Sequence, residues 1–196
     1  MSRIALPIIA LLCFAQLALA QAPAPAPAAG PRVKLHTTLG DITVELDADK
    51  APKTVANFLH YVKDGFYSGT IFHRVIAGFM AQGGGFTKDL KEKPTRPAIP
   101  NEAKHGLSNA KYTIAMARTR DPDSATSQFY INLADNPNLD YAGDAPAARG
   151  YCVFGKVIEG QDVVDKIGAA ATGPSGRFAS DVPTTPIAID KAELLK

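Results

Sequence analysis

Two neighbouring stretches in the first quarter of the chain alternate apolar and polar residues. In the first, Val33 and Leu35 alternate with polar residues, and in the second Ile42, Val44 and Leu46 do the same, with a glycine-containing turn between them. A period of two on both sides of such a turn is typical of a β-hairpin. We therefore expect the folded part of the chain to begin with two antiparallel strands.

The period changes in the next segment, APKTVANFLHYVKDG. Its apolar residues recur at i, i+3, i+4 and i+7, the spacing of one helix face, and they are Val55, Phe58, Leu59 and Val62. A proline near its start suits the first helical turn, and the glycine at its end suits a helix stop. This segment predicts an amphipathic α-helix.

Six later segments have the short apolar runs of strands, and glycine, proline and asparagine residues separate them. In chain order they are TIFHRVI, GFMAQGG, YTIAMA, SQFYINL, GYCVFGKVI and TPIAIDKAEL. The segment EGQDVVDKIG, between the last two, places Val163, Val164 and Ile167 on one side and predicts a short second helix.

The number and order of these elements indicate a mainly β domain. About eight strands with only two helices do not alternate one for one, which argues against a doubly wound α/β sheet. A closed antiparallel barrel with a helix over each end would pair every strand edge and fits the count. A β-sandwich fits the strand count nearly as well, so spacing alone gives the barrel only a modest preference. Residues 32–196 are enough for one domain with a sizeable core.

The N-terminus has the layout of a secretory signal peptide. An apolar run follows Arg3, and small residues precede a cleavage point after Ala20. A membrane anchor is the alternative, but a proline and a glutamine interrupt the run, whose unbroken part is shorter than the roughly 20 residues that span a bilayer. We expect a cleaved signal peptide over residues 1–20, a semi-rigid Ala/Pro-rich spacer over 21–31, and export to the periplasm.

Charge and cysteine content argue against nucleic-acid binding, binding to acidic membranes and an internal disulfide. The formal net charge is +2, and loss of Arg3 with the signal peptide lowers it to +1. A nearly neutral chain has no electrostatic footprint for nucleic acid or for an acidic membrane surface. Cys13 would leave with the signal peptide, so Cys152 would have no internal disulfide partner, and its apolar neighbours predict a buried, inert thiol.

Common catalytic and ligand-binding motifs do not fit this chain. The three glycines that begin at Gly83 lack the lysine of a phosphate-binding loop and the spacing of a dinucleotide loop, so we interpret them as a strand end. The four histidines are far apart in sequence, and no pair has metal-ligand spacing. Ser124 and Ser127 lack a nucleophile-elbow motif. No metal or other cofactor is therefore expected.

The stretch FHRVIAGFMAQGGG places one positive charge near large apolar residues. If FHRV is a strand, Phe72 and Arg74 share one face while His73 and Val75 share the other. Singly, its neighbours Phe79 and Met80 are typical of a core, Arg74 of a solvated charge and Gln82 of a strand edge. Together these four residues indicate a charged donor beside an apolar patch and an amide.

Three segments carry a resemblance to a known family. FHRVIAGFMAQGGG, IAMARTRDPDSATSQFYINL and YCVFGKVIEG resemble the cyclophilin-type peptidyl-prolyl cis-trans isomerases in order and in spacing, and the similarity extends from about residue 33 to residue 194. The resemblance implies a closed eight-stranded antiparallel β-barrel capped by two α-helices, whose active surface lies outside the barrel. The ATSQFYINLADN pattern and the exported N-terminus are similar to the bacterial periplasmic branch.

The resemblance also implies the site. Arg74 would be the catalytic arginine, and the proline pocket would be lined by Phe79, Met80, Tyr130 and Leu139. The peptide on either side would be held by the side chains of Gln82 and Gln128 and by the backbone around Ala117 and Arg118, with Tyr151 in the position of a family histidine.

Two departures from the family pattern have expected consequences. Tyr130 stands where a phenylalanine is usual, so its hydroxyl needs a partner or water. Asn138 stands where eukaryotic members have tryptophan, which implies weak cyclosporin binding.

The expected activity is acceleration of X-Pro bond rotation in exported polypeptides that are still folding, by a monomer that has no membrane contact after signal cleavage. Two alternatives remain: a non-catalytic module or holdase that binds proline-containing segments, and an exported carrier with a ligand cavity inside the barrel. The arginine favours catalysis, because binding alone needs no donor aimed at the prolyl nitrogen. The apolar alternation of YTIAMA and QFYINL disfavours the carrier.

Overall fold

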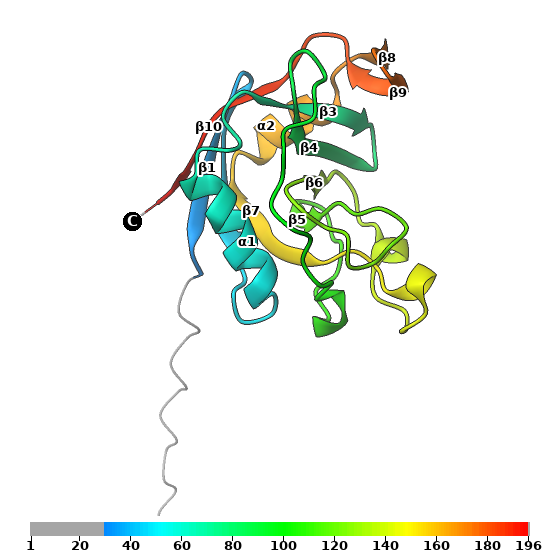
Figure 1. The fold of residues 1–196 in the computed structure, drawn as a ribbon. Coiled ribbons are helices and arrows are strands. Elements are labelled where there is room, and N and C mark those ends of the chain that lie inside the picture. Colours follow the sequence, from blue (N-terminus) through cyan, green and yellow to red (C-terminus); the bar gives the residue numbers. More distant parts are fainter. Residues whose placement is uncertain (1–29, 196) are drawn as a thin grey trace, which may run out of the picture.

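The computed structural model describes residues 30–195, and its strands form a closed antiparallel barrel (Figure 1). Neighbouring strands follow the order β1-β10-β3-β4-β6-β5-β7-β2. These strands are β1 (Arg32–Thr37), β2 (Gly40–Leu46), β3 (Thr70–Ile76), β4 (Met80–Thr87), β5 (Thr113–Met116), β6 (Phe129–Asn132), β7 (Val153–Glu159) and β10 (Ala188–Leu194). The barrel is thereby confirmed, and the sandwich is wrong. The predicted signal peptide and residues 21–29 of the predicted spacer lie outside the described residues.

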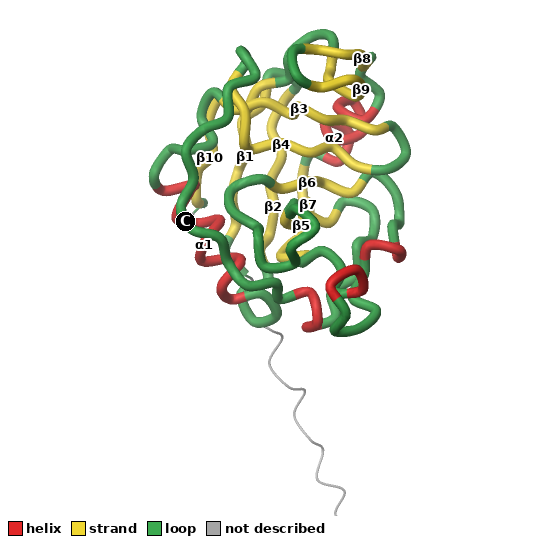
Figure 2. The backbone as a smooth tube through the Cα atoms, turned by 45° about the vertical axis from the view of Figure 1, so that its right-hand side comes forward, coloured by secondary structure: helices red, strands yellow, loops and turns green. Residues whose placement is uncertain are grey.

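Two helices pack against the barrel, as the apolar periodicity predicts. They are α1 (Pro52–Lys63) and α2 (Gln161–Gly168), and both ribbon views place them at different ends of the barrel (Figures 1 and 2). Helix α1 buries Val55, Phe58 and Val62, and α2 buries Val163, Val164 and Ile167. No helix within residues 30–195 is long and apolar enough to cross a membrane.

Side chains fill the barrel interior. Phe58 contacts Tyr67, Phe129 and Phe154 with ring centroids 5.2 to 5.7 Å apart, distances typical of favourable aromatic pairs. These rings belong to one apolar cluster that includes residues from every strand of the barrel and from both helices. A filled interior argues against the carrier alternative, since a carrier needs an internal cavity.

The N-terminus of α1 is capped by a residue from a distant loop. Ala51, at the capping position, has no side chain that could accept a hydrogen bond. The carboxylate of Glu102 instead accepts hydrogen bonds from the backbone N–H of Lys53 at 3.1 Å and of Thr54 at 2.8 Å, and from the Thr54 hydroxyl at 2.8 Å. An acid at this position satisfies free N–H groups and interacts favourably with the helix dipole.

One sequence-based expectation about β3 is wrong. Phe72 and Val75 both lie in the barrel core, whereas Arg74 points toward solvent, so Phe72 and Arg74 do not share a face. The reason is an irregularity in the β3–β4 pairing, where Phe72 pairs with Gly83 but Arg74 pairs with Gln82. A β-bulge of this kind changes the side-chain alternation of a strand.

A small hairpin that we did not expect from the sequence packs on β3. It consists of β8 (Thr172–Ser175) and β9 (Phe178–Pro183), which form a separate two-stranded sheet beside β3 (Figures 1 and 2). Phe178 anchors it, because its ring packs against Phe86 at 5.3 Å and against His73 at 5.6 Å. Glycine and proline residues in these short strands hide the alternation that predicts β-structure.

Candidate functional site

Three polar and aromatic side chains form a row across adjacent strands on the outer face of the barrel. Arg74 on β3 pairs with Gln82 on β4, which pairs with Tyr130 on β6, and Ala115 on β5 follows. Residues paired in this way have Cβ atoms about 5 Å apart. The bulge in β3 therefore brings the Arg74 side chain to the same outer surface as Gln82 and Tyr130.

An apolar patch surrounds this row. Its buried members are Met80, Ala115, Tyr130 and Val153, and its partly buried members are Ile76, Phe79, Leu107, Ala117, Leu139 and Tyr151. The structure thus brings together all four residues that the family resemblance placed in the proline pocket, together with Ala117 and Tyr151. We name this group of ten residues the outer apolar patch.

Loops position two of these pocket residues. Phe79 lies in the turn before β4, and its carbonyl oxygen accepts hydrogen bonds from the Leu133 N–H and from the Asn136 side chain, both at 2.9 Å. Leu139 ends a 3₁₀ turn (Pro137–Leu139), and its carbonyl oxygen accepts the Tyr151 N–H at 2.9 Å. These bonds hold the two loop segments at fixed positions beside the strands.

The Tyr130 hydroxyl has a protein partner. It donates to Oδ1 of Asn109 at 2.7 Å, and the Asn109 amide donates to Asp140 at 2.9 Å. Burial raises the pKa of Tyr130, with smaller contributions from Tyr151 and Asp140. The ring is therefore neutral and fixed, with its hydroxyl turned into the fold. Asn109 lies in a long connection between strands, and no sequence pattern predicted it as the partner of the Tyr130 hydroxyl.

Two amides border the patch on the side of β4. The Gln82 side chain donates to the Gln128 side-chain oxygen at 2.9 Å, and Gln128 in turn lies 3.5 Å from Glu92. Both glutamines are partly exposed. Their mutual hydrogen bond fixes the orientation of each side chain.

Arg118 stacks on Tyr151, a member of the outer apolar patch. Its guanidinium carbon lies 4.4 Å from the ring centroid, and its Nε donates to the Gly150 carbonyl at 2.9 Å. The backbone N–H of Ala117 donates to the Gln128 carbonyl at 3.0 Å. This N–H is therefore used by the fold, and the predicted role of the Ala117 backbone in holding a peptide stays a prediction.

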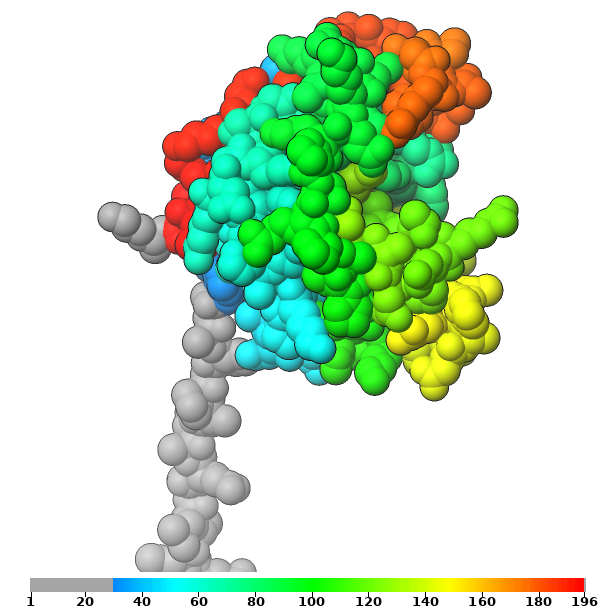
Figure 3. Space-filling view, viewed as in Figure 1, coloured from blue at the N-terminus to red at the C-terminus, as the bar shows by residue number. Residues whose placement is uncertain are grey.

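Arg74 also has a charged partner that sequence analysis missed. Its Nε lies 3.8 Å from Oδ2 of Asp181 on β9, and the two side chains are 44% and 31% exposed. In the space-filling view the hairpin that carries Asp181 and the loops after β5 and β6 protrude on the same side of the molecule (Figure 3). The site thus lies between a strand hairpin and loops that are distant in sequence.

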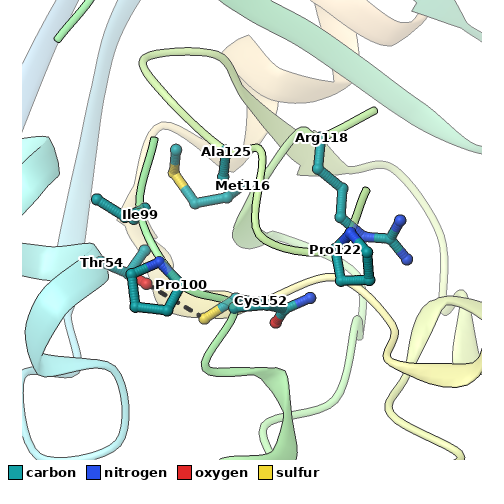
Figure 4. Close-up of a pocket in the computed structure, with 9 residues that line it drawn as sticks. Thr54, Ile99, Pro100, Met116, Arg118, Pro122, Ala125 and Cys152 are labelled. Carbon is teal, nitrogen blue, oxygen red and sulfur yellow. Dashed lines mark hydrogen bonds between the residues drawn. The ribbon is translucent and has the colours of Figure 1, made fainter. Parts of the chain in front are cut away.

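A small hollow lies beneath the loop that carries Arg118. Its volume is about 10 Å³, enough for at most one water molecule. Figure 4 shows Thr54 and Cys152 facing each other, 3.5 Å apart, with Arg118 extended beside Pro122 on the far side. Burial raises the pKa of the Cys152 thiol to about 11. The predicted buried thiol is confirmed, and it is protonated and inert at neutral pH.

Among residues 30–195, no three His, Cys, Asp or Glu side chains are grouped so that they could hold a metal ion. Ser124 accepts a hydrogen bond from the Thr119 N–H at 2.9 Å and donates to the Asp121 carbonyl at 2.7 Å, which matches a turn. The outer apolar patch and its border bring together a cation, two amides and apolar side chains.

Known proteins are similar to this chain in sequence and in fold. The family described as "Cyclophilin type peptidyl-prolyl cis-trans isomerase/CLD" matches residues 32–194. Peptidyl-prolyl cis-trans isomerase cyp18 of Streptomyces antibioticus is 55% identical over 163 residues, which cover 83% of this chain and 98% of that protein. Peptidyl-prolyl cis-trans isomerase B of Escherichia coli is 53% identical over 158 residues, which cover 81% and 96%.

Solved structures agree with this match. A cyclophilin-type isomerase of Cryptosporidium parvum superimposes with a TM-score of 0.67 at 26% identity, covering 85% of this chain and 98% of that one. A second crystal structure of the same protein, in the presence of the dipeptide Ala-Pro, also has a TM-score of 0.67 at 26% identity, with coverages of 84% and 99%.

Proposed function

The chain belongs to the cyclophilin-type peptidyl-prolyl cis-trans isomerases, and on this premise we propose that Arg74 performs the catalytic step at the outer apolar patch. The observation that carries the proposal is the cross-strand row of Arg74, Gln82 and Tyr130 beside that patch. A permanent cation next to an apolar surface supports a site that would bind a proline ring.

Arg74 would act on the electronic change that accompanies rotation. The X-Pro bond has partial double-bond character, which gives a rotation barrier of about 18–20 kcal/mol. In the twisted state the prolyl nitrogen loses this resonance and regains its lone pair. A donor that hydrogen-bonds this nitrogen stabilises the transition state more than the planar ground state. An arginine is always charged, so it would donate this hydrogen bond without any proton transfer.

The apolar patch would hold the proline ring. Met80 and Tyr130 are 3% and 4% exposed and form its floor, while Phe79 and Leu139 stand partly exposed at its border. Burial of the ring contributes about 25 cal/mol per Å² of apolar surface. Gln82 would bond the peptide next to the ring. The relative crystallised in the presence of Ala-Pro supports a proline-containing ligand.

Substitution of the arginine tests this proposal. We expect Arg74→Ala to keep the fold, because the side chain is 44% exposed, and to lower kcat/KM for a proline-containing test peptide about a hundredfold or more. Arg96→Ala is the matched control, since Arg96 is 50% exposed and pairs with Asp64. NMR exchange spectroscopy measures both. Full activity of Arg74→Ala would overturn the residue assignment and the mechanism.

The same experiment separates catalysis from binding. A holdase would bind a proline-containing segment without accelerating its isomerisation, and Arg74→Ala would then change affinity rather than an exchange rate. The favoured role is catalytic because Arg74 lies next to Gln82 in the cross-strand row at the patch, where a donor would reach the bond next to a bound ring.

The cellular role extends the proposal. The apolar run that follows Arg3 and the small residues before Ala20 support export to the periplasm, where a monomer would act on exported proteins that are still folding. N-terminal sequencing of the protein from a periplasmic fraction tests export, and a first residue other than Gln21 would contradict cleavage after Ala20.

The residue at position 138 concerns inhibitor binding. Asn138 in place of tryptophan supports weak cyclosporin binding.

A further inference from the structure

A groove of about 610 Å³ lies on the outside of the barrel beside the outer apolar patch. Its walls come from the end of β2 and the following loop, from the loop before β5, and from β7, and they include Glu45, Asp49, Ser108 and Lys156. Leu107 and Val153 line the groove and also belong to the patch. The groove and the proposed proline site are therefore continuous.

The first described residues of the chain also line this groove. The Pro31 carbonyl accepts the Leu46 N–H at 2.9 Å, which fixes the start of the domain against β2. A Cβ on Gly30 would lie 1.8 Å from the Leu46 carbonyl oxygen, so only glycine allows this close approach. The described chain consequently begins, at Gly30, on the β2 side of the groove.

The segment before Gly30 contains the kind of ligand that the proposed site binds. Residues 21–29 read QAPAPAPAA, with three successive Ala-Pro pairs and no charged side chain. The proposed catalytic step, the barrel and the core give this segment no role. Its composition nevertheless matches the dipeptide present with the Cryptosporidium parvum relative.

The sheet register shows how far the segment has to extend. Leu46 pairs with Gly155, Gly155 with Ile114, and Ile114 with Ile131, the neighbour of Tyr130. Three strand spacings of about 4.8 Å plus one residue along β6 place Tyr130 about 15 Å from Leu46. An Ala/Pro-rich chain advances about 3.1 Å per residue, so about five residues cover this distance. Pro25 is the fifth residue before Gly30.

We infer that the Ala-Pro segment 21–29 binds in this groove of its own chain and presents the Ala24–Pro25 bond to the proline site, as a competitor of external substrates and as an intramolecular substrate. This inference rests on the proposed function of the site. A short tether gives a ligand an effective concentration of the order of millimolar, so weak intrinsic affinity is sufficient for partial occupancy. External peptides then have to displace the segment, which raises their apparent KM and leaves kcat unchanged.

Removal of the three prolines in the full chain tests the inference. We expect the triple variant Pro23→Ala, Pro25→Ala and Pro27→Ala to lower the KM for a proline-containing test peptide two- to fivefold, with unchanged kcat. The matched control, Gln21→Ser with Ala28→Ser and Ala29→Ser, keeps every Ala-Pro pair and should keep the wild-type KM. An unchanged KM in the triple variant would overturn the inference.

NMR exchange spectroscopy on the isolated protein supplies a second readout. Uncatalysed X-Pro isomerisation takes tens of seconds or longer. We expect faster exchange of the Ala24–Pro25 bond in the wild type, at a rate independent of protein concentration, and slow exchange in Arg74→Ala. A rate that grows with protein concentration would assign the segment to a second copy and contradict the same-chain contact. A wild type inactive on the test peptide would refute the proposed function itself, whereas an active wild type with an uncatalysed Ala24–Pro25 bond refutes only this inference.

Discussion

The Nε atom of Arg74 lies 3.8 Å from Oδ2 of Asp181 and links β3 to the hairpin of β8 and β9. Asp181 has a φ of 68°, a left-handed conformation that aspartate tolerates better than most residues. Within the described part of the chain this is the one ion pair of Arg74, and it engages the inner nitrogen of the guanidinium.

This pair predicts an effect on catalysis from a residue outside the patch. Asp181→Asn keeps the side-chain size and tolerates the same φ, so the fold should be unchanged. A partly exposed ion pair contributes about 0–1 kcal/mol, so we expect kcat/KM to fall up to about fivefold as Arg74 loses its orientation. Asp162→Asn removes an ion pair with Lys166 on α2 and is the control. Wild-type isomerisation by Asp181→Asn would show that the ion pair does not orient the arginine.

Tyr130→Phe separates the ring from the hydroxyl. The hydroxyl bonds Asn109 inside the fold, and Asn109 Oδ1 keeps a second donor, Asn132, at 3.3 Å. We therefore expect a loss of about 1 kcal/mol in the free energy of unfolding, measured by urea denaturation, with isomerisation almost unchanged. Asn109→Ala should cost more, because it also removes the bond to Asp140. A large loss of activity at unchanged stability would instead place the hydroxyl on the substrate.

Glu102 predicts a stability effect that is independent of the site. Because its carboxylate caps α1 through Lys53 and Thr54, Glu102→Ala should lower the free energy of unfolding by about 1–3 kcal/mol. Glu102→Gln keeps one acceptor oxygen and should lose less. Urea denaturation midpoints measure both variants, and an unchanged midpoint for Glu102→Ala would rule out this capping role.

His73 predicts a loss of stability in acid. The residue is 2% exposed and packs against Phe86 and Phe178. Burial, with smaller contributions from the charges of Arg74 and Arg177, lowers its pKa to about 4. At pH values between the unfolded-state pKa near 6.5 and the folded-state pKa, the unfolded chain binds more protons than the folded chain. The stabilisation of the folded state by neutral His73 is therefore complete above pH 6.5 and is lost as the pH falls toward 4.

The size of this effect follows from the shift in pKa. At 1.36 kcal/mol per unit, protonation of His73 would cost up to about 3 kcal/mol by pH 4. We expect His73→Phe, which keeps an aromatic ring and does not titrate, to flatten the stability profile from pH 6.5 to pH 4 in urea denaturation. His60→Gln, on the exposed side of α1, should keep the wild-type slope. An equally steep profile for His73→Phe would assign the acid sensitivity to other groups.

Local patterns predicted the regular elements well. The alternation in β1 and β2 and the helical spacing of α1 depend on neighbours within a few residues, so their bounds could be anticipated. The hairpin of β8 and β9 could not, because it is held by Phe178 packing on Phe86 rather than by a clear alternation of its own. The choice of barrel over sandwich rested on the family resemblance.

The residues of the candidate site also differ in whether the sequence could predict them. Phe79, Met80, Tyr130 and Leu139 could be named from motifs, and the structure places them in one patch. Asp181 and the Asn109 network could not be named, because each acts through a contact with a distant segment. Both are polar residues in stretches that looked like ordinary connections.

By itself the sequence determined the barrel strands, the two helices and the set of motif residues, since burial of alternating apolar side chains and the conformations of glycine and proline act over short range. Only the tertiary structure decided which face Arg74 occupies, because a bulge is a property of two paired strands. It also decided that Glu102 caps a helix 48 residues away. Such contacts depend on barrel closure, which brings distant segments together and leaves no local trace in the chain.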